Sequence, residues 1–116
     1  MTEPVGFDAK AAFRRAELDR LCVTLTAIER ADEDGDYDTR NRLVMEAVTL
    51  AQELGFRAGY RIDPDEPAWP VAVIELVMPD GSEAQVSWHL PEHPRRWDGH
   101  DTDEKYRRIH AFTSAN

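Results

Sequence analysis

The chain has 116 residues, of which 41% are hydrophobic and 32% are charged. This length and composition predict one globular domain and exclude a collagen-like, low-complexity or wholly disordered chain. The formal net charge is −9, from 23 acidic and 14 basic residues. Long nucleic acids and anionic membranes attract Lys and Arg, so a net-acidic chain is a poor candidate for either. The negative charge remains compatible with a basic partner, a small ligand or mimicry of an acidic polymer.

Targeting signals and cysteine usage predict a cytoplasmic protein. No apolar run approaches the roughly 18–20 residues of a transmembrane helix. The first residues, Met1 to Gly6, lack the basic and apolar regions of a signal peptide. Cys22 is the single cysteine, so the sequence predicts neither an internal disulfide nor a Cys-x-x-Cys zinc site.

An antiparallel helical hairpin is predicted over residues 8–55, after residues 1–7 that we expect to be flexible. The first helix begins at the capping residue Asp8 and ends near Ala31; the second begins near Asp38 or Thr39. Gly55 stands where a left-handed C-terminal cap is expected. Apolar residues recur at helical spacing in both segments: Leu18, Leu21, Leu25 and Ile28, then Leu43, Val44, Ala47, Leu50, Ala51 and Leu54.

A small antiparallel sheet of about three strands is predicted over residues 56–90. The expected strands are Arg57–Ile62, Val71–Val77 and Ala84–Leu90, and Pro79-Asp80-Gly81 forms the turn between the last two. Residues 91–116 predict a loop and a C-terminal helix from Asp101 to about Phe112, which packs through Tyr106, Ile109 and Phe112. The fold class is therefore α+β, in a single domain over residues 1–116.

Two metal hypotheses are weighed and neither is favoured. If Gly35 takes position 6 of an EF-hand loop, Arg30 falls at position 1 and Asn41 at position 12, where carboxylates are required. The histidines His89, His93 and His100, with Asp98, could converge on a transition metal, but they lie across a proline-containing loop. No cofactor is expected.

The segment from Val86 to His110 is the densest concentration of site-like chemistry in the chain. It combines tryptophans, histidines and cations that can stack on a base and hold a phosphate. The alternative is structural: Trp88 and Trp97 fill the core, and Glu104, Lys105 and Arg108 form exposed helix pairs. The predicted ligand-binding residues are Trp88, His89, Arg95, Arg96, Trp97, His100, Lys105, Tyr106 and Arg107.

The stretch VSWHLPEHPRRWDGHDTDEKYRRI, which follows GYRIDPDEPAWPVAVIEL, resembles a family of small proteins of actinobacteriophages and related genomes. The resemblance covers roughly residues 55–112 and leaves out the N-terminal helices. It transfers no activity residue by residue, but it implies a phage accessory protein in the host cytoplasm. The hairpin segment Val77–Glu83 is longer than the tight turn that we expect there.

Three functions follow as hypotheses. The first is a non-catalytic binding protein that engages a host factor or sequesters a small nucleotide-like ligand, in host takeover or anti-defence. No phosphate loop, nucleophile elbow or dinucleotide fingerprint is present to favour turnover. The second is a small hydrolase or phosphodiesterase that uses His89, His93 or His100, oriented by Glu104 or Asp98. The third is a structural or assembly homodimer formed through the apolar stripe of the second helix.

Overall fold

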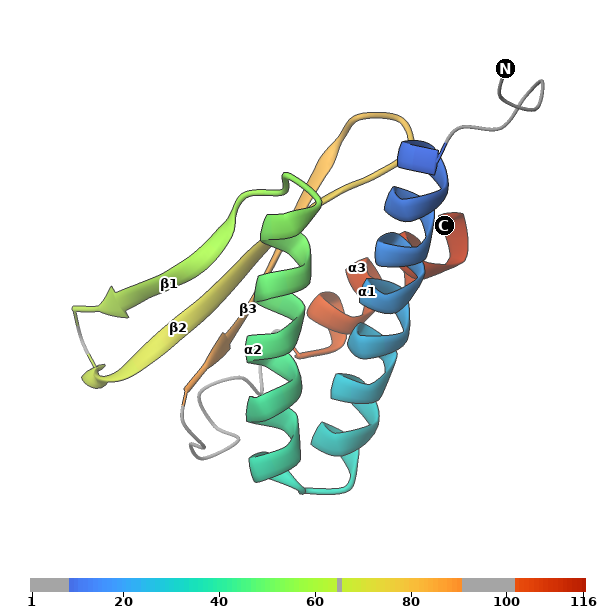
Figure 1. Ribbon diagram of the computed structural model, residues 1–116. Coiled ribbons are helices and arrows are strands. Elements are labelled where there is room, and N and C mark those ends of the chain that lie inside the picture. Colours follow the sequence, from blue (N-terminus) through green and yellow to red (C-terminus); the bar gives the residue numbers. More distant parts are fainter. Residues whose placement is uncertain (1–8, 65, 91–101) are drawn as a thin grey trace, which may run out of the picture.

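The structure is a computed structural model that describes residues 9–64, 66–90 and 102–116 (Figure 1). It confirms the predicted α+β class, with two packed helices, a three-stranded antiparallel sheet and a C-terminal helix. The elements in chain order are α1 (Ala9–Glu33), α2 (Tyr37–Glu53), β1 (Ala58–Asp63), β2 (Glu66–Val77), β3 (Glu83–His89) and α3 (Thr102–Ala115). None of the described helices is long and apolar enough to cross a membrane.

The two N-terminal helices pack side by side and are joined by a short acidic turn. Asp36 caps α2, because its Oδ1 accepts a hydrogen bond from the Thr39 backbone N–H at 3.2 Å. The helix therefore begins at Tyr37, slightly earlier than the predicted start. Gly55 follows α2 with a φ of 87°, which confirms the predicted left-handed position. The apolar stripe of α2 is buried in the core of the protein, so it is not available for the homodimer that was one of the three hypotheses.

The sheet has the order β1-β2-β3, with both neighbouring pairs antiparallel. β2 begins at Glu66 rather than at the predicted Val71, although Pro67 and Pro70 lie in the added part. Pro70 is tolerated because it stands just beyond the paired part of β3. Its carbonyl accepts from the Leu90 N–H at 2.6 Å, while its own nitrogen has no hydrogen to donate.

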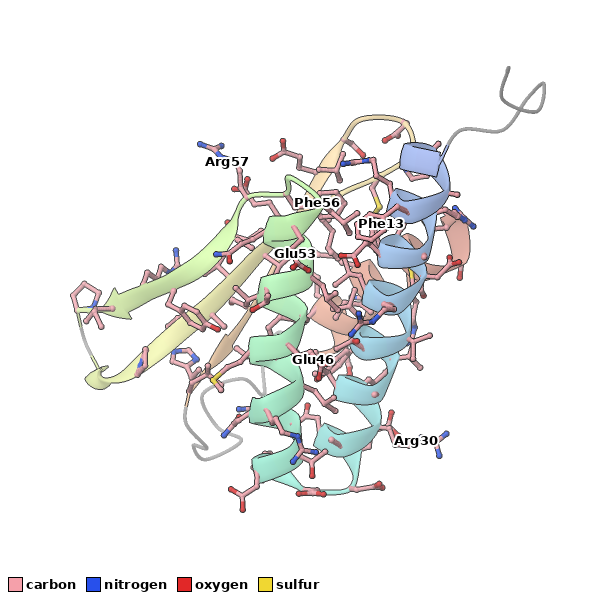
Figure 2. All side chains as sticks on the ribbon, in the orientation of Figure 1. Phe13, Arg30, Glu46, Glu53, Phe56 and Arg57 are labelled. Carbon is pink, nitrogen blue, oxygen red and sulfur yellow. The ribbon has the colours of Figure 1, made fainter. Side chains whose placement is uncertain are left out.

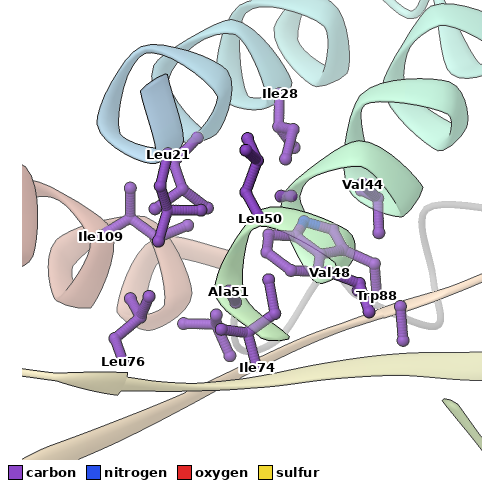
Figure 3. Close-up of a cluster of buried hydrophobic side chains, with 14 of the residues drawn as sticks. Leu21, Ile28, Val44, Val48, Leu50, Ala51, Ile74, Leu76, Trp88 and Ile109 are labelled. Atoms are coloured by element: carbon purple, nitrogen blue, oxygen red, sulfur yellow. The ribbon is translucent and has the colours of Figure 1, made fainter. Parts of the chain in front are cut away.

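One face of the sheet forms the core with the three helices (Figure 3). Alternate strand residues point to this face, and Trp88 lies at its centre with no exposed surface. The C-terminal helix closes the core through Ile109 and Phe112, as predicted, and the Phe56 and Phe112 rings meet edge to face at 6.1 Å. The inner-face strand residues are Ala72, Ile74, Leu76, Val86 and Trp88.

Candidate functional site

Three of the predicted ligand-binding residues lie in the protein interior. Trp88, Lys105 and Tyr106 are all buried. The Lys105 ammonium donates to the Ser87 carbonyl at 3.1 Å and lies 5.4 Å from the centre of the Trp88 ring and 5.5 Å from that of Tyr106. These contacts are intramolecular cation–π and hydrogen-bonding interactions. In this structure the two rings and the ammonium therefore support the fold and present no open stacking surface.

Tyr106 also belongs to a buried polar network that joins α1, α2 and α3. Its hydroxyl donates to Asp32 Oδ2 at 3.0 Å, and Arg40 places a guanidinium nitrogen 4.0 Å from Asp32 Oδ1. Burial, and then the negative charge of Asp32, raise the pKa of the Tyr106 phenol above its ordinary value. The phenol consequently remains a hydrogen-bond donor, and the network fixes the end of α1 against α3.

The outer edge of β3 is closed by three cationic side chains. Carbonyl oxygens of alternate residues point out of this edge, and each accepts a hydrogen bond from a cation. Arg108 donates to the Gln85 carbonyl at 2.8 Å, Lys105 to the Ser87 carbonyl at 3.1 Å, and Arg40 to the His89 carbonyl at 2.9 Å. The edge is thereby protected from pairing with another strand.

The other predicted residues divide between the outside of α3 and segments that the structure does not describe. Arg95, Arg96, Trp97 and His100, with His93 and Asp98, lie outside the described residues. Arg107 and Glu104 are exposed on α3, where Glu104 pairs with Arg108. Within the described ranges, no group of three His, Cys, Asp or Glu side chains could hold a metal ion.

An acidic hollow of about 390 Å³ lies between the end of α1 and the start of α3. The His110 ring and the Glu29 carboxylate meet across it at 2.7 Å, and Arg107 also lines it. Its acidic lining residues are Glu29, Asp32, Glu33 and Asp103. This hollow offers negative charge to a cationic group.

The face of the sheet that points away from the core carries a different set of side chains. The register aligns these side chains in three rows that run across the strands. The middle row has small side chains, and the two rows beside it contain polar side chains. Two adjoining hollows, of about 580 and 260 Å³, lie over this face and share Arg61. We call this surface the sheet-face trough. Its rows are Arg57–Glu75–Gln85, Gly59–Val73–Ser87 and Arg61–Val71–His89.

Each end of the sheet-face trough carries a charged side chain. At one end, Glu75 Oε2 is buried and accepts no hydrogen bond from the described residues, since the nearest guanidinium nitrogen, on Arg57, is 3.7 Å away. Arg57 itself is 82% exposed and projects from the start of β1 (Figure 2). At the other end, exposed Arg61 makes no ion pair within the described chain. A buried carboxylate oxygen without a donor is a costly arrangement that a bound donor would relieve.

Sequence reasoning missed most of the trough and found only His89. The signal was the period-two pattern Arg57-x-Gly59-x-Arg61 in a predicted strand, which places both cations on one face. That face could not be assigned to the outside without knowing the register against β2, because Val71 and Val73 on the same face are apolar.

Comparison with protein-family models, with curated proteins and with solved structures finds no match to this chain.

Proposed function

We propose that the protein is a non-catalytic binding protein that holds a small nucleotide-like ligand on the sheet-face trough. One observation carries the proposal: among the described residues, a buried acceptor without a hydrogen-bond donor, Glu75 Oε2, and an exposed cation without an ion pair, Arg61, lie at opposite ends of one surface. A ligand with a hydrogen-bond donor at one end and an anionic group at the other satisfies both. A nucleoside phosphate, with a base amino group and a phosphate, has this chemistry.

The spacing of the two groups suits such a ligand. Glu75 and the Arg61 partner Val71 are four residues apart on β2, which is about 13 Å at the rise of an antiparallel strand. The small middle row between them, Gly59 and Val73 with Ser87, leaves room for a flat ring to lie on the sheet. His89 stands beside Val71 in the Arg61 row and adds an imidazole near the phosphate end.

The proposal keeps the predicted ligand class but moves its site. The sequence assigned the phosphate to Arg95, Arg96 or Arg107. Lys105, another predicted ligand-binding residue, instead caps the edge of β3. The phage accessory role implied by the family resemblance would make the bound molecule a signalling nucleotide of the host. Sequestering it needs tight binding and no turnover.

Calorimetric titration with adenosine, guanosine, cytidine and uridine monophosphates, and with ribose 5-phosphate, tests the proposal. Arg61→Gln should weaken every phosphate-bearing ligand by about tenfold or more, because a charge-assisted hydrogen bond is worth about 1.5–3 kcal/mol. Glu75→Leu should weaken the nucleotides that carry a base amino group and leave ribose 5-phosphate unchanged.

The matched controls are Arg42→Gln and Glu53→Leu, which make the same chemical changes at exposed positions of α2. Neither should alter binding. Absence of binding by all five ligands at millimolar concentration would refute the proposal. Equal losses in the trough variants and in the controls would show that only overall charge matters.

A second candidate is docking of a basic segment of a host protein in the acidic hollow between α1 and α3. The observation that favours it is the gathering of Glu29, Glu33 and Asp103 around one cavity, in a chain of net charge −9. Its signature is a steep loss of affinity from low to physiological salt, since exposed charges are screened. Glu33→Gln should weaken a bound Lys-rich peptide, whereas Arg61→Gln should leave its binding unchanged.

A further inference from the structure

The two edges of the sheet differ in a way that points to a second interaction surface. β3 presents alternate carbonyls that are each capped by a cation, as described above. β1 is the opposite edge, and its outward groups can be identified from its pairing. The Glu75 N–H donates to the Arg57 carbonyl at 2.8 Å, so Arg57, Gly59 and Arg61 bond inward to β2. The backbone groups of Ala58 and Tyr60 then point out of the edge, and the register becomes irregular between Arg61 and Asp63.

Among the described residues, side chains cap only the beginning of this edge. Gln52 Nε2 donates to the Ala58 carbonyl at 2.9 Å, which confirms that this carbonyl points outward. Within the described chain, no side chain donates to the carbonyls of Tyr60 or Ile62. An edge strand with free backbone groups is a template for another strand, and natural proteins usually block such edges.

Exposed apolar side chains gather along the same edge. Tyr60 is 52% exposed and Ile62 is 60% exposed. Met45, 48% exposed, lies two helical turns before Gln52 and therefore on the side of α2 that faces β1. These are three of the five large hydrophobic residues that the described chain leaves exposed. A strand paired with β1 would bury them.

We propose that two copies of this chain form a two-fold dimer by antiparallel pairing of their β1 strands, centred on Tyr60. In an antiparallel pair, residues whose backbone groups point out of one edge must lie opposite residues of the same kind in the other copy. This requirement allows the two-fold axis to pass through Gly59, Tyr60 or Arg61. A centre at Arg61 places two arginines opposite each other, and a centre at Gly59 places Arg57 opposite Arg61. Like charges directly opposite are destabilising.

The Tyr60 register avoids both conflicts. It pairs Tyr60 with Tyr60, and Ala58 with Ile62, and it sets Arg61 of one copy beside Gly59 of the other. The edge of β1 is thus complementary to itself in one register, which selects a second copy over an unrelated strand. The pairing also joins the two sheets into one of six strands and increases the buried surface of a small domain.

This dimer stands independently of the proposed ligand, but it would complete the sheet-face trough. Gly59 lies in the small middle row, and the register places the second copy's Arg61 next to it. Each trough would then have a cation from both copies.

Sedimentation velocity over a wide concentration series tests the dimer. Tyr60→Lys puts two ammonium groups opposite each other across the axis and should raise the dissociation constant at least about 30-fold, which corresponds to about 2 kcal/mol. Val23→Lys is the control, because Val23 is 69% exposed on α1, away from this edge, and its change should leave the dimer intact. Thermal unfolding of each variant checks that the fold is retained.

A cross-linking experiment covers the case in which Tyr60→Lys does not fold. In a Cys22→Ser background, Tyr60→Cys should form a disulfide-linked dimer on mild oxidation, and Val23→Cys should not. A wild-type protein that is monomeric at every concentration overturns the proposal. A dimer that survives Tyr60→Lys, or one that cross-links equally well through Val23→Cys, also overturns it.

Discussion

Replacing Arg40 with methionine should be among the most destabilising changes in the described chain. Its guanidinium is almost fully buried, donates to the His89 carbonyl at 2.9 Å and to Asn41 Oδ1 at 2.9 and 3.1 Å, and lies 4.0 Å from Asp32 Oδ1. Methionine keeps most of the volume and removes the charge. Breaking one partner of a buried ion pair costs about 3–5 kcal/mol, because the remaining charge stays in the interior. That is a large part of the roughly 5–15 kcal/mol that stabilises a domain.

The attribution to the buried pair can be tested by a double-mutant cycle. Asp32→Asn should also destabilise the fold, but Arg40→Met combined with Asp32→Asn should cost about 2 kcal/mol less than the sum of the single changes, since no buried charge is left uncompensated. Urea unfolding followed by tryptophan fluorescence gives each free energy. Arg20→Met, which breaks the exposed Arg20–Glu46 pair, should cost less than about 1 kcal/mol. A cost below 1 kcal/mol for Arg40→Met, or strict additivity in the cycle, would refute the reasoning.

Two further predictions concern α3. Tyr106 has a folded-state pKa above its unfolded value of 10.0, so its contribution to stability is complete below pH 10 and is lost as the pH rises further. Tyr106→Phe should therefore flatten the alkaline fall of the unfolding free energy, and an unchanged slope would contradict it. Lys105→Met should destabilise the fold by about 1–2 kcal/mol through loss of the bond to the Ser87 carbonyl, whereas Arg107→Met on the exposed side should change it by less than about 0.5 kcal/mol, as measured by urea unfolding.

Local signals in the sequence were sufficient for most of the fold. Asp36 and Gly55 mark the two ends of α2, and each acts through contacts within a few residues of the chain. The residue types alone therefore predict these helix ends. The turn at Gly81 is of the same kind: its φ is 87°, and Asp80 accepts from the Ser82 N–H at 2.9 Å. The spacing of Tyr106, Ile109 and Phe112 likewise predicted the buried side of α3.

The candidate site required long-range information that residue type does not hold. Lys105 and Arg108 lie about one helical turn apart in the sequence. This spacing fits an exposed phosphate-binding pair as well as it fits two side chains that bind backbone carbonyls. Their carbonyl partners lie 18 and 23 residues earlier in the chain and become partners only through the packing of α3 beside β3. The start of β2 was missed for a similar reason, because Pro70 breaks a strand only where the neighbouring strand needs its N–H.

The distribution of the cations resolves the apparent conflict between a net charge of −9 and an anionic ligand. Arg40, Lys105 and Arg108 donate to backbone carbonyls at the β3 edge, so these three cations support the fold; only Lys105 among them was a predicted ligand-binding residue. The acidic hollow lies between α1 and α3, on the helical side of the sheet, and Arg61 lies on the opposite face. Exposed charges are screened over about 8 Å at physiological salt. With the sheet and the core between them, the acidity of the hollow has little influence on the ligand proposed at Arg61, so the net charge of −9 does not count against that proposal.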